Sequence, residues 1–130
     1  MTFLIVEDSR TARNMIKNLI FEMKIGKAGR FFEAESGESS LEILLKYDID
    51  FIFMDWNLAT EMTGIDVIKM VRKMDKYKKI PILMISSEND KFHVVESLKI
   101  GANDFIVKPI DQKSFSEKVL KLAALIEPVD

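Results

Sequence analysis

Short apolar runs recur along the chain and alternate with longer segments of helical periodicity. Four of the five runs contain almost only apolar residues, which is typical of parallel strands that helices cover on both faces. The predicted strands span residues 2–6, 31–35, 51–55, 80–86 and 104–108. The run at 31–35, Phe-Phe-Glu-Ala-Glu, alternates apolar and polar residues instead, so we expect it at an edge of the sheet.

Amphipathic segments connect these strands. Apolar residues recur at helical spacing within residues 12–23, 41–45, 67–74, 94–98 and 115–126. Helix caps are expected at Asp8 or Ser9, at Asn89 or Asp90, and at Asp111. Five strands and five helices joined by right-handed crossovers predict an α/β fold with a doubly wound, five-stranded parallel sheet. We expect the flavodoxin-like order 2-1-3-4-5, which places the polar strand at an edge but leaves the apolar fifth strand at the other edge unexplained.

The composition is that of an ordinary soluble domain. At 130 residues the chain is long enough for one domain, spanning residues 1–130, and we expect a monomer. The absence of cysteine excludes disulfides and thiolate chemistry and fits a cytoplasmic location. No apolar segment is long enough for a signal peptide or a membrane span, and a net charge of −2 does not indicate nucleic-acid binding. We interpret His93 and the basic stretch from Lys69 to Lys79 as solvated.

Polar side chains follow the apolar strands where these end: Glu7 and Asp8, Asp55, Ser86 and Lys108. The carboxyl ends of parallel strands meet at one edge of the sheet, and the site of such folds lies at the switch in strand order, here between the first and third strands. Two of the three carboxylates lying ~5 Å apart would repel by roughly 3 kcal/mol. Either one carboxyl keeps its proton or a hard cation binds, and oxygen ligands of this kind favour Mg2+.

This set of groups matches the chemistry of phosphoryl transfer to an aspartate. Asp55 would be the nucleophile, while Mg2+ and the Lys108 ammonium would neutralise charge on the phosphoryl oxygens. Each residue also has a simpler explanation. Asp55 could cap a helix, Glu7 and Asp8 could stabilise a helix N-terminus, and Ser86 could simply end a strand. The combination of all of them favours the site.

Four short motifs carry a resemblance to a known family. They are Leu4-Ile5-Val6-Glu7-Asp8-Ser9, Met54-Asp55-Trp56-Asn57, Ile85-Ser86-Ser87-Glu88 and Val107-Lys108-Pro109. With these motifs in this order and spacing, the whole chain resembles a response-regulator receiver domain and is most similar to the single-domain members that act in chemotaxis. The resemblance implies that Asp55 accepts a phosphoryl group from a phosphohistidine on a sensor histidine kinase.

The resemblance also implies a metal site and a means of losing the phosphoryl group. Asp8, Asp55 and the backbone carbonyl of Asn57 would bind Mg2+, with help from Glu7. Asn57 and Glu88 would tune dephosphorylation. Glu7 stands where the family often has aspartate, so its longer side chain would alter the metal geometry.

A switch is implied on the other side of the site. Ser86 and Lys108 would contact the phosphoryl oxygens, and Phe105 would respond by repacking the surface around the fourth helix and fifth strand. The peptide bond before Pro109 is a candidate for the cis form. Ala59 replaces a common proline, and the loop from Trp56 to Thr63 is one residue longer than is usual in the family.

Several functions remain open from the sequence. The first is a phosphorylation-activated switch that is not an enzyme in its own right and that docks a partner, such as a flagellar motor component or a phosphatase. The second is a phosphorelay intermediate or phosphate sink, and the chain could also be a receiver domain excised from a larger response regulator. The third is a small Mg2+-dependent phosphatase.

Overall fold

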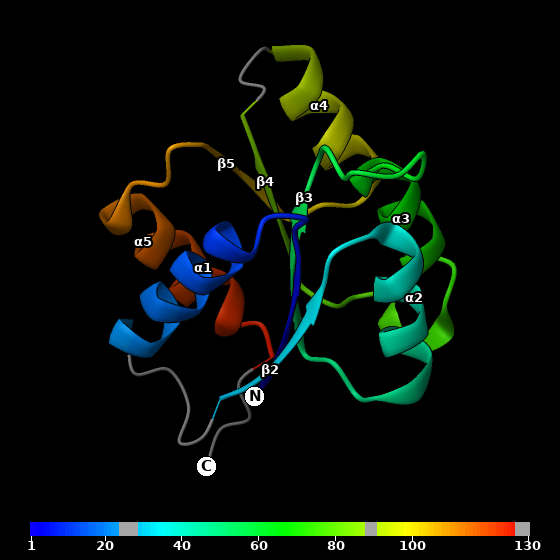
Figure 1. The fold of residues 1–130 in the computed structure, drawn as a ribbon, viewed down its shortest axis with the longest axis horizontal. Helices are drawn as coiled ribbons and strands as arrows, with labels where there is room; N and C mark the ends of the chain where they lie inside the picture. Colours follow the sequence, from blue (N-terminus) through cyan, green and yellow to red (C-terminus); the bar gives the residue numbers. More distant parts are fainter. Residues whose placement is uncertain (24–28, 88–90, 127–130) are drawn as a thin grey trace.

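The computed structural model describes residues 1–23, 29–87 and 91–126. Its strands form one sheet in the order β2-β1-β3-β4-β5, which confirms the predicted order. The strands are β1 (Thr2–Val6), β2 (Arg30–Ala34), β3 (Phe51–Asp55), β4 (Ile82–Ser86) and β5 (Asp104–Val107). Every strand pair is parallel, so the carboxyl ends of the strands lie at one end of the sheet, uppermost in Figure 1.

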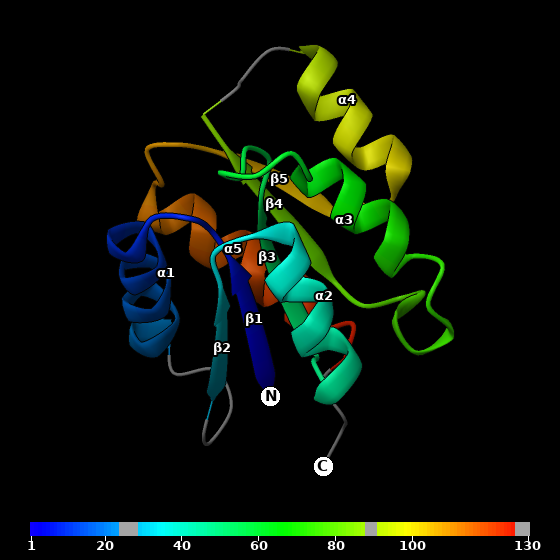
Figure 2. The same ribbon diagram turned by 45° about the vertical axis from the view of Figure 1, so that its right-hand side comes forward.

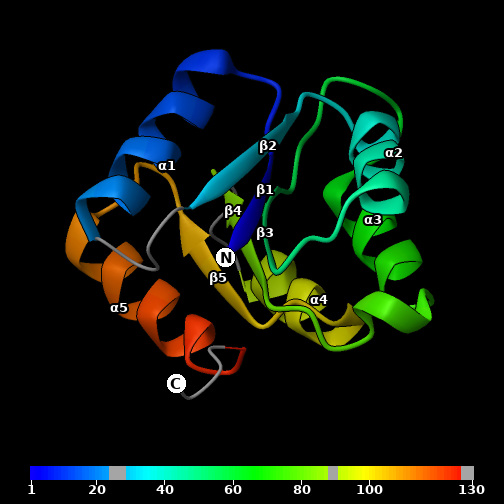
Figure 3. The same cartoon turned by 90° about the horizontal axis from the view of Figure 1, so that it is seen from below.

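Helices cover both faces of this sheet. One face carries α1 (Arg10–Met23) and α5 (Gln112–Ala123), and the other carries α2 (Gly37–Lys46), α3 (Gly64–Val71) and α4 (Lys91–Ile100), as Figures 1 and 3 show. A short 3-10 helix, η1 (Asp75–Tyr77), follows α3. Within the described residues, none of the helices has the length and apolar character needed to cross a bilayer.

The strands divide their side chains between two apolar cores. In β3, Phe51 and Phe53 pack in the core beneath α1 and α5, whereas Ile52 and Met54 pack in the core beneath α2, α3 and α4. All five residues of β3 are buried. Burial on both faces explains why this run of sequence shows no alternation of polar and apolar residues.

Strand boundaries differ slightly from the predicted ones. β2 begins at Arg30 and ends at Ala34, one residue earlier than predicted. β4 begins only at Ile82, because the preceding Pro81 has no N–H to donate, although its carbonyl accepts the Ile52 N–H at 3.0 Å. β5 ends at Val107, so Lys108 lies just beyond the strand.

Two predicted caps can be compared with the structure. Asp111 caps α5 and accepts the Ser114 N–H at 2.8 Å, as predicted. At α1 the Ser9 hydroxyl accepts the Ala12 N–H at 3.2 Å, so Ser9 rather than Asp8 is the cap. The cap predicted at residues 89–90 lies outside the described residues.

The apolar edge strand β5 has a specific partner in α5. The Lys118 ammonium donates to the Phe105 carbonyl at 2.7 Å and to Asp104 Oδ1 at 3.2 Å. This side chain satisfies a main-chain acceptor of the strand and places a charge beside it. Charged side chains at an edge oppose pairing with other chains, so Lys118 supplies the protection that the sequence of β5 itself lacks.

Part of the basic stretch is not solvated, contrary to our interpretation of the sequence. The Arg72 guanidinium folds back from the end of α3 and donates to the Gly101 carbonyl at 2.6 and 3.0 Å. Burial lowers the pKa of Arg72. The side chain therefore joins α3 to the turn between α4 and β5.

Candidate functional site

Three carboxylates gather at the carboxyl ends of β1 and β3, as the strand order predicts. Glu7 and Asp8 follow β1, and Asp55 is the last residue of β3. Each offers an oxygen atom, and these atoms all lie within 4.8 Å of one another. Lys108 reaches the same place from the end of β5, with its ammonium 3.3 Å from Asp55 Oδ2. The four charged groups thus share one site at the switch in strand order.

Asp55 is held rigidly and is poorly solvated. Its residue is 6% exposed. Oδ1 accepts the Asn57 N–H at 3.3 Å, and Oδ2 faces Lys108. Burial raises the pKa of Asp55, and the nearby Lys108 charge only partly opposes this effect. A carboxylate in such surroundings gains from any further positive charge, which is the condition for binding a cation or an electrophilic phosphorus group.

Glu7 is the closest partner of Lys108. The Lys108 ammonium lies 2.6 Å from Glu7 Oε1, and Glu7 Oε2 accepts the Ser9 N–H at 3.0 Å. Desolvation lowers the pKa of Lys108, but its hydrogen bond to Glu7 and the charges of Asp55 and Glu7 outweigh this and raise it. The extra methylene of a glutamate at this position therefore lets residue 7 hold the lysine more closely than Asp55 does.

Asp8 is the exposed member of the cluster. Its hydrogen bond with Glu7 is the main reason that the pKa of Asp8 is raised, with desolvation and the Glu7 charge acting in the same direction. Among the described residues one lysine faces three carboxylates, so these groups carry an excess of negative charge whenever all three carboxylates are ionised. A set of oxygen donors with this excess fits Mg2+, and Asp8 and Asp55 are the residues that would hold it.

Ser86 and Phe105 lie on the neighbouring strands. Ser86 ends β4 and is fully buried, and its carbonyl accepts the Lys108 N–H at 2.8 Å. Phe105 is 5% exposed and packs in the core beneath α2, α3 and α4. The peptide bond between Lys108 and Pro109 is cis, in agreement with the expectation from the family resemblance. Glu88 lies outside the described residues.

Sequence reasoning missed two residues that support the site. A Cβ atom on Gly64, the first residue of α3, would lie 2.2 Å from the carbonyl oxygen of Asp55, so only glycine allows this close approach. Arg13 is buried in α1, and its Nη1 donates to the Glu7 carbonyl at 2.7 Å. A glycine just after a polar loop and an arginine on an apolar helix face were the available signals.

His93 is also closer to the site than we expected. Its ring lies 4.5 Å from the Trp56 ring in an edge-on contact, and both side chains are partly buried. The interpretation of His93 as a solvated residue is therefore wrong. Because Trp56 directly follows Asp55, this contact connects α4 to the phosphoacceptor candidate.

Comparisons with known proteins agree with this geometry. Residues 3–120 match the family model of the response regulator receiver domain. The chain is 36% identical to chemotaxis protein CheY-3 of Vibrio cholerae over 122 residues. This aligned region covers 94% of this chain and 91% of that protein. The chain belongs to the response regulator receiver domain family. More particularly, it is a CheY-like receiver domain.

Solved structures have the same fold. Chemotaxis protein CheY4 of Vibrio cholerae superposes with a TM-score of 0.82 at 27% identity, over 93% of this chain and 97% of that one. The receiver domain of a sensor histidine kinase of Pseudomonas aeruginosa, with a magnesium ion coordinated in its active site cleft, has a TM-score of 0.81 over 95% and 97% of the two chains. At 18% identity this second likeness shows the fold alone.

Proposed function

We propose that this receiver domain is a phosphorylation-activated switch of a two-component system. A carboxylate oxygen of Asp55 attacks the phosphorus of a phosphohistidine on a sensor histidine kinase. The new O–P bond forms as the N–P bond breaks, and the histidine is released. The observation that carries the proposal is the position of Asp55: buried at the end of β3, beside two further carboxylates and 3.3 Å from the Lys108 ammonium.

The residues around Asp55 divide the work of this reaction. Lys108 supplies a positive charge for the phosphoryl oxygens. Ser86 is the last residue of the neighbouring strand β4, and its side chain would contact the same oxygens. Bound Mg2+ would neutralise negative charge on the same oxygens. Asp8, Asp55 and the Asn57 carbonyl would hold the ion, with Glu7 assisting. The support for this assignment is the cluster of carboxylate oxygens from Glu7, Asp8 and Asp55, which lie within 4.8 Å of one another.

Lys108 must change partner when the phosphoryl group arrives. In the structure its shortest contact is with Glu7 Oε1, at 2.6 Å. A phosphoryl group on Asp55 adds negative oxygens on the other side of the ammonium and draws it away from Glu7. Phe105 is already buried, so the switch consists of repacking around Phe105 and α4 rather than of an aromatic ring moving in from solvent.

The output is a changed binding surface on and beside α4. The similarity to CheY-3 and CheY4, both chemotaxis proteins, supports a flagellar motor component as the partner, with a phosphatase as a further one. The domain then acts in the cytoplasm, and it assists its own phosphorylation and dephosphorylation, without turning over a separate substrate. Asn57, bonded to Asp55 through its N–H, belongs to the part of the site that sets the phosphate lifetime.

The direct test is intact-protein mass spectrometry after incubation with acetyl phosphate and Mg2+. The wild-type protein should gain one phosphoryl group, and peptide mapping should place it on Asp55. Asp55→Asn should gain none, and a chelator should stop labelling of the wild-type protein. A phosphoryl group on Asp55→Asn would place the acceptor elsewhere, and labelling that is indifferent to the chelator would refute the metal site.

A further inference from the structure

Arg72 carries a charge that the described residues do not neutralise. Each of its five N–H groups is used in a hydrogen bond, but every acceptor is a neutral oxygen. These acceptors are the carbonyls of Tyr77, Lys78 and Gly101 and the side-chain oxygen of Asn103. A guanidinium stays protonated in proteins. The arrangement therefore fixes one full positive charge in a half-buried position, and no carboxylate of residues 1–23, 29–87 or 91–126 pairs with it.

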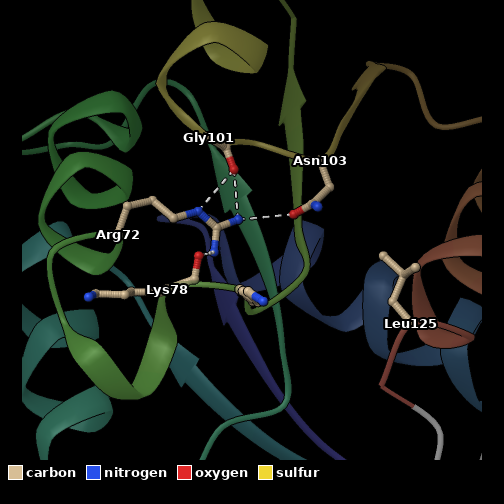
Figure 4. A pocket seen from close by; sticks show the side chains of 6 residues that line it. Arg72, Lys78, Gly101, Asn103 and Leu125 are labelled. Atoms are coloured by element: carbon tan, nitrogen blue, oxygen red, sulfur yellow. Dashed lines mark hydrogen bonds between the residues drawn. The ribbon is translucent and has the colours of Figure 1, made fainter.

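This charge borders a cavity of about 500 Å3, which we call the Arg72 cavity. Its lining residues are Arg72, Lys78, Lys79, Gly101, Asn103 and Leu125. The volume lies within the range of small-molecule sites in proteins. Figure 4 shows the Arg72 guanidinium on one side, bonded to Gly101 and Asn103, and Leu125 on the opposite side. The cavity lies at the amino ends of β4 and β5, so it is at the opposite end of the sheet from Asp55.

A second cation lines the same cavity. Lys79 forms no ion pair with any other described residue. The neighbouring Lys78 is paired with the exposed Asp75 at 3.1 Å, and Figure 4 shows its side chain extending away from Leu125. Arg72 and Lys79 are therefore the two cations whose charge is available to an occupant of the cavity.

The fold explains Arg72 but not the rest of the cavity. Arg72 ties α3 to the turn between α4 and β5, and that role would be complete without Lys79. Asn103 uses its side-chain oxygen twice, toward Arg72 Nη2 and the Ile82 N–H, which fixes the orientation of its amide. Its NH2 group remains as a donor with no partner among the described residues. Leu125 is 67% exposed and adds an apolar wall.

We propose that the Arg72 cavity binds a small organic phosphate. The phosphate group would contact the Lys79 ammonium and the Asn103 NH2 group, within reach of the fixed Arg72 charge, and its apolar substituent would lie against Leu125. A phosphate monoester carries close to two negative charges at neutral pH, which matches the two cations that the described residues leave without an ion pair better than a carboxylate does. Lysine is a common phosphate ligand and acts as a point charge. This site is independent of phosphoryl transfer at Asp55.

The test is an NMR titration of the 15N-labelled protein with phenyl phosphate as the probe. The side-chain NH2 of Asn103 and the Nε–H of Arg72 report on the Arg72 cavity, while the backbone N–H of Asn57 reports on the Asp55 end. We expect saturable shifts at Arg72 and Asn103 at millimolar probe, without matching shifts at Asn57. Shifts confined to Asn57, or shifts that never saturate, would overturn the proposal.

Two lysine variants distinguish a site from a diffuse positive surface. Lys79→Gln removes the cation in the cavity, and we expect it to weaken binding about three- to tenfold, as for the loss of one partly solvated charge contact. Lys73→Gln removes another exposed cation of the same basic stretch that does not line the cavity, and it should leave the affinity unchanged. Equal weakening by both variants would show a general charge effect and overturn the site.

Two further probes test the chemical class of the ligand. Benzoate has the apolar ring but a single charge, and inorganic phosphate has the charge but no apolar part. Both should bind more weakly than phenyl phosphate. If either bound as tightly, the assignment to an organic phosphate would be wrong. Leu125→Ser should weaken phenyl phosphate more than inorganic phosphate, and an equal effect on both would contradict contact with the apolar wall.

Discussion

The neighbouring helices α3 and α4 cover the same face of the sheet but are held to it very differently. Five of the eight residues of α3 are buried, and Thr63 and Asp66 form a capping box at its start. In α4 only Ser97 is buried among ten residues. Three large apolar side chains of α4, those of Phe92, Val95 and Leu98, are between 44% and 68% exposed. Figure 2 shows the two helices side by side.

This contrast separates the part of the molecule that positions the site from the part that is able to move. Gly64 of α3 abuts the Asp55 carbonyl, so α3 must stay in place for the site to form. α4 reaches the edge of the site through the contact between His93 and Trp56. A helix with few buried side chains has little packing energy to lose on repositioning. The proposed switch therefore uses the loosely packed helix and leaves the tightly packed one as a scaffold.

The largest expected effect comes from truncating one side chain on each helix. Ile68 of α3 is fully buried, and Ile68→Ala should lower the free energy of unfolding by about 2–5 kcal/mol. Val95 of α4 is 48% exposed, and Val95→Ala should change it by less than about 0.5 kcal/mol. Urea denaturation of both variants measures the difference. Similar losses for the two would mean that α4 is as firmly packed as α3.

A smaller loss of stability is expected at the contact between Arg72, after α3, and Gly101, after α4. Gly101, after α4, has a φ of +124°, and a Cβ atom there would lie 2.9 Å from two atoms of Arg72. Gly101→Ala should therefore cost about 1–3 kcal/mol, because it adds backbone strain and displaces a side chain whose N–H groups are all bonded. The same denaturation measurement applies, with amide hydrogen exchange to locate the opening in α4 and its following turn.

The control for this variant is Gly29→Ala. A Cβ atom at Gly29 would meet its nearest neighbours at 3.6 Å, which is ordinary van der Waals contact. This substitution should change stability by less than about 0.5 kcal/mol. If Gly101→Ala were as mild as the control, the turn after α4 would be free to adopt another conformation, and the link to α3 would not restrain α4.

Much of the fold could be predicted because its strands are buried on both faces. The short apolar run at 51–55 has no alternation and favours a strand inside a covered sheet, and the alternating run at 31–35 favours a strand with one face or one edge in water. The boundaries of the strands were harder to predict. β2 begins at Arg30 because the main chain of this residue pairs with Thr2 of β1, while the Arg30 side chain is exposed. Nothing in a local pattern marks that residue as part of the strand.

The site was predictable for a related reason. Parallel strands bring their carboxyl ends together, so polar residues at those ends must converge whatever the loops do. Arg72, in contrast, acts across 29 positions of sequence, and four of its five hydrogen bonds go to main-chain carbonyls, which carry no signature in the sequence. The contact of His93 with Trp56 depends on where α4 lies over the sheet. Such contacts need the tertiary structure.

The smallest expected effect on stability concerns α1, which extends the comparison to a third helix. Ion pairs connect α1 to the edge strand β2. Glu33 of β2 accepts from Arg13 Nε at 2.9 Å and from Lys17 Nζ at 3.0 Å. Partial burial alone would raise the pKa of Glu33, but the hydrogen bonds and charges of Lys17 and Arg13 outweigh it and lower the pKa below its ordinary value of 4.5. α1 is therefore anchored by a titratable group in addition to its buried Ile16 and Ile20, whereas the buried residues of α3 are all uncharged.

The sign of the pH dependence follows from that lowered pKa. The stabilisation from Glu33 is fully present above the unfolded-state pKa and is lost as the pH falls through the folded-state value. Glu33→Gln should cost about 0.2–1 kcal/mol at pH 7, since the carboxylate is partly solvated, and the difference from wild type should shrink as the pH falls below the ordinary value of 4.5 and through the lowered folded-state pKa. Glu42→Gln, at an exposed position of α2, is the control. A difference that stays constant from pH 7 down through the range in which Glu33 is protonated would show that this carboxylate contributes by packing and not by charge.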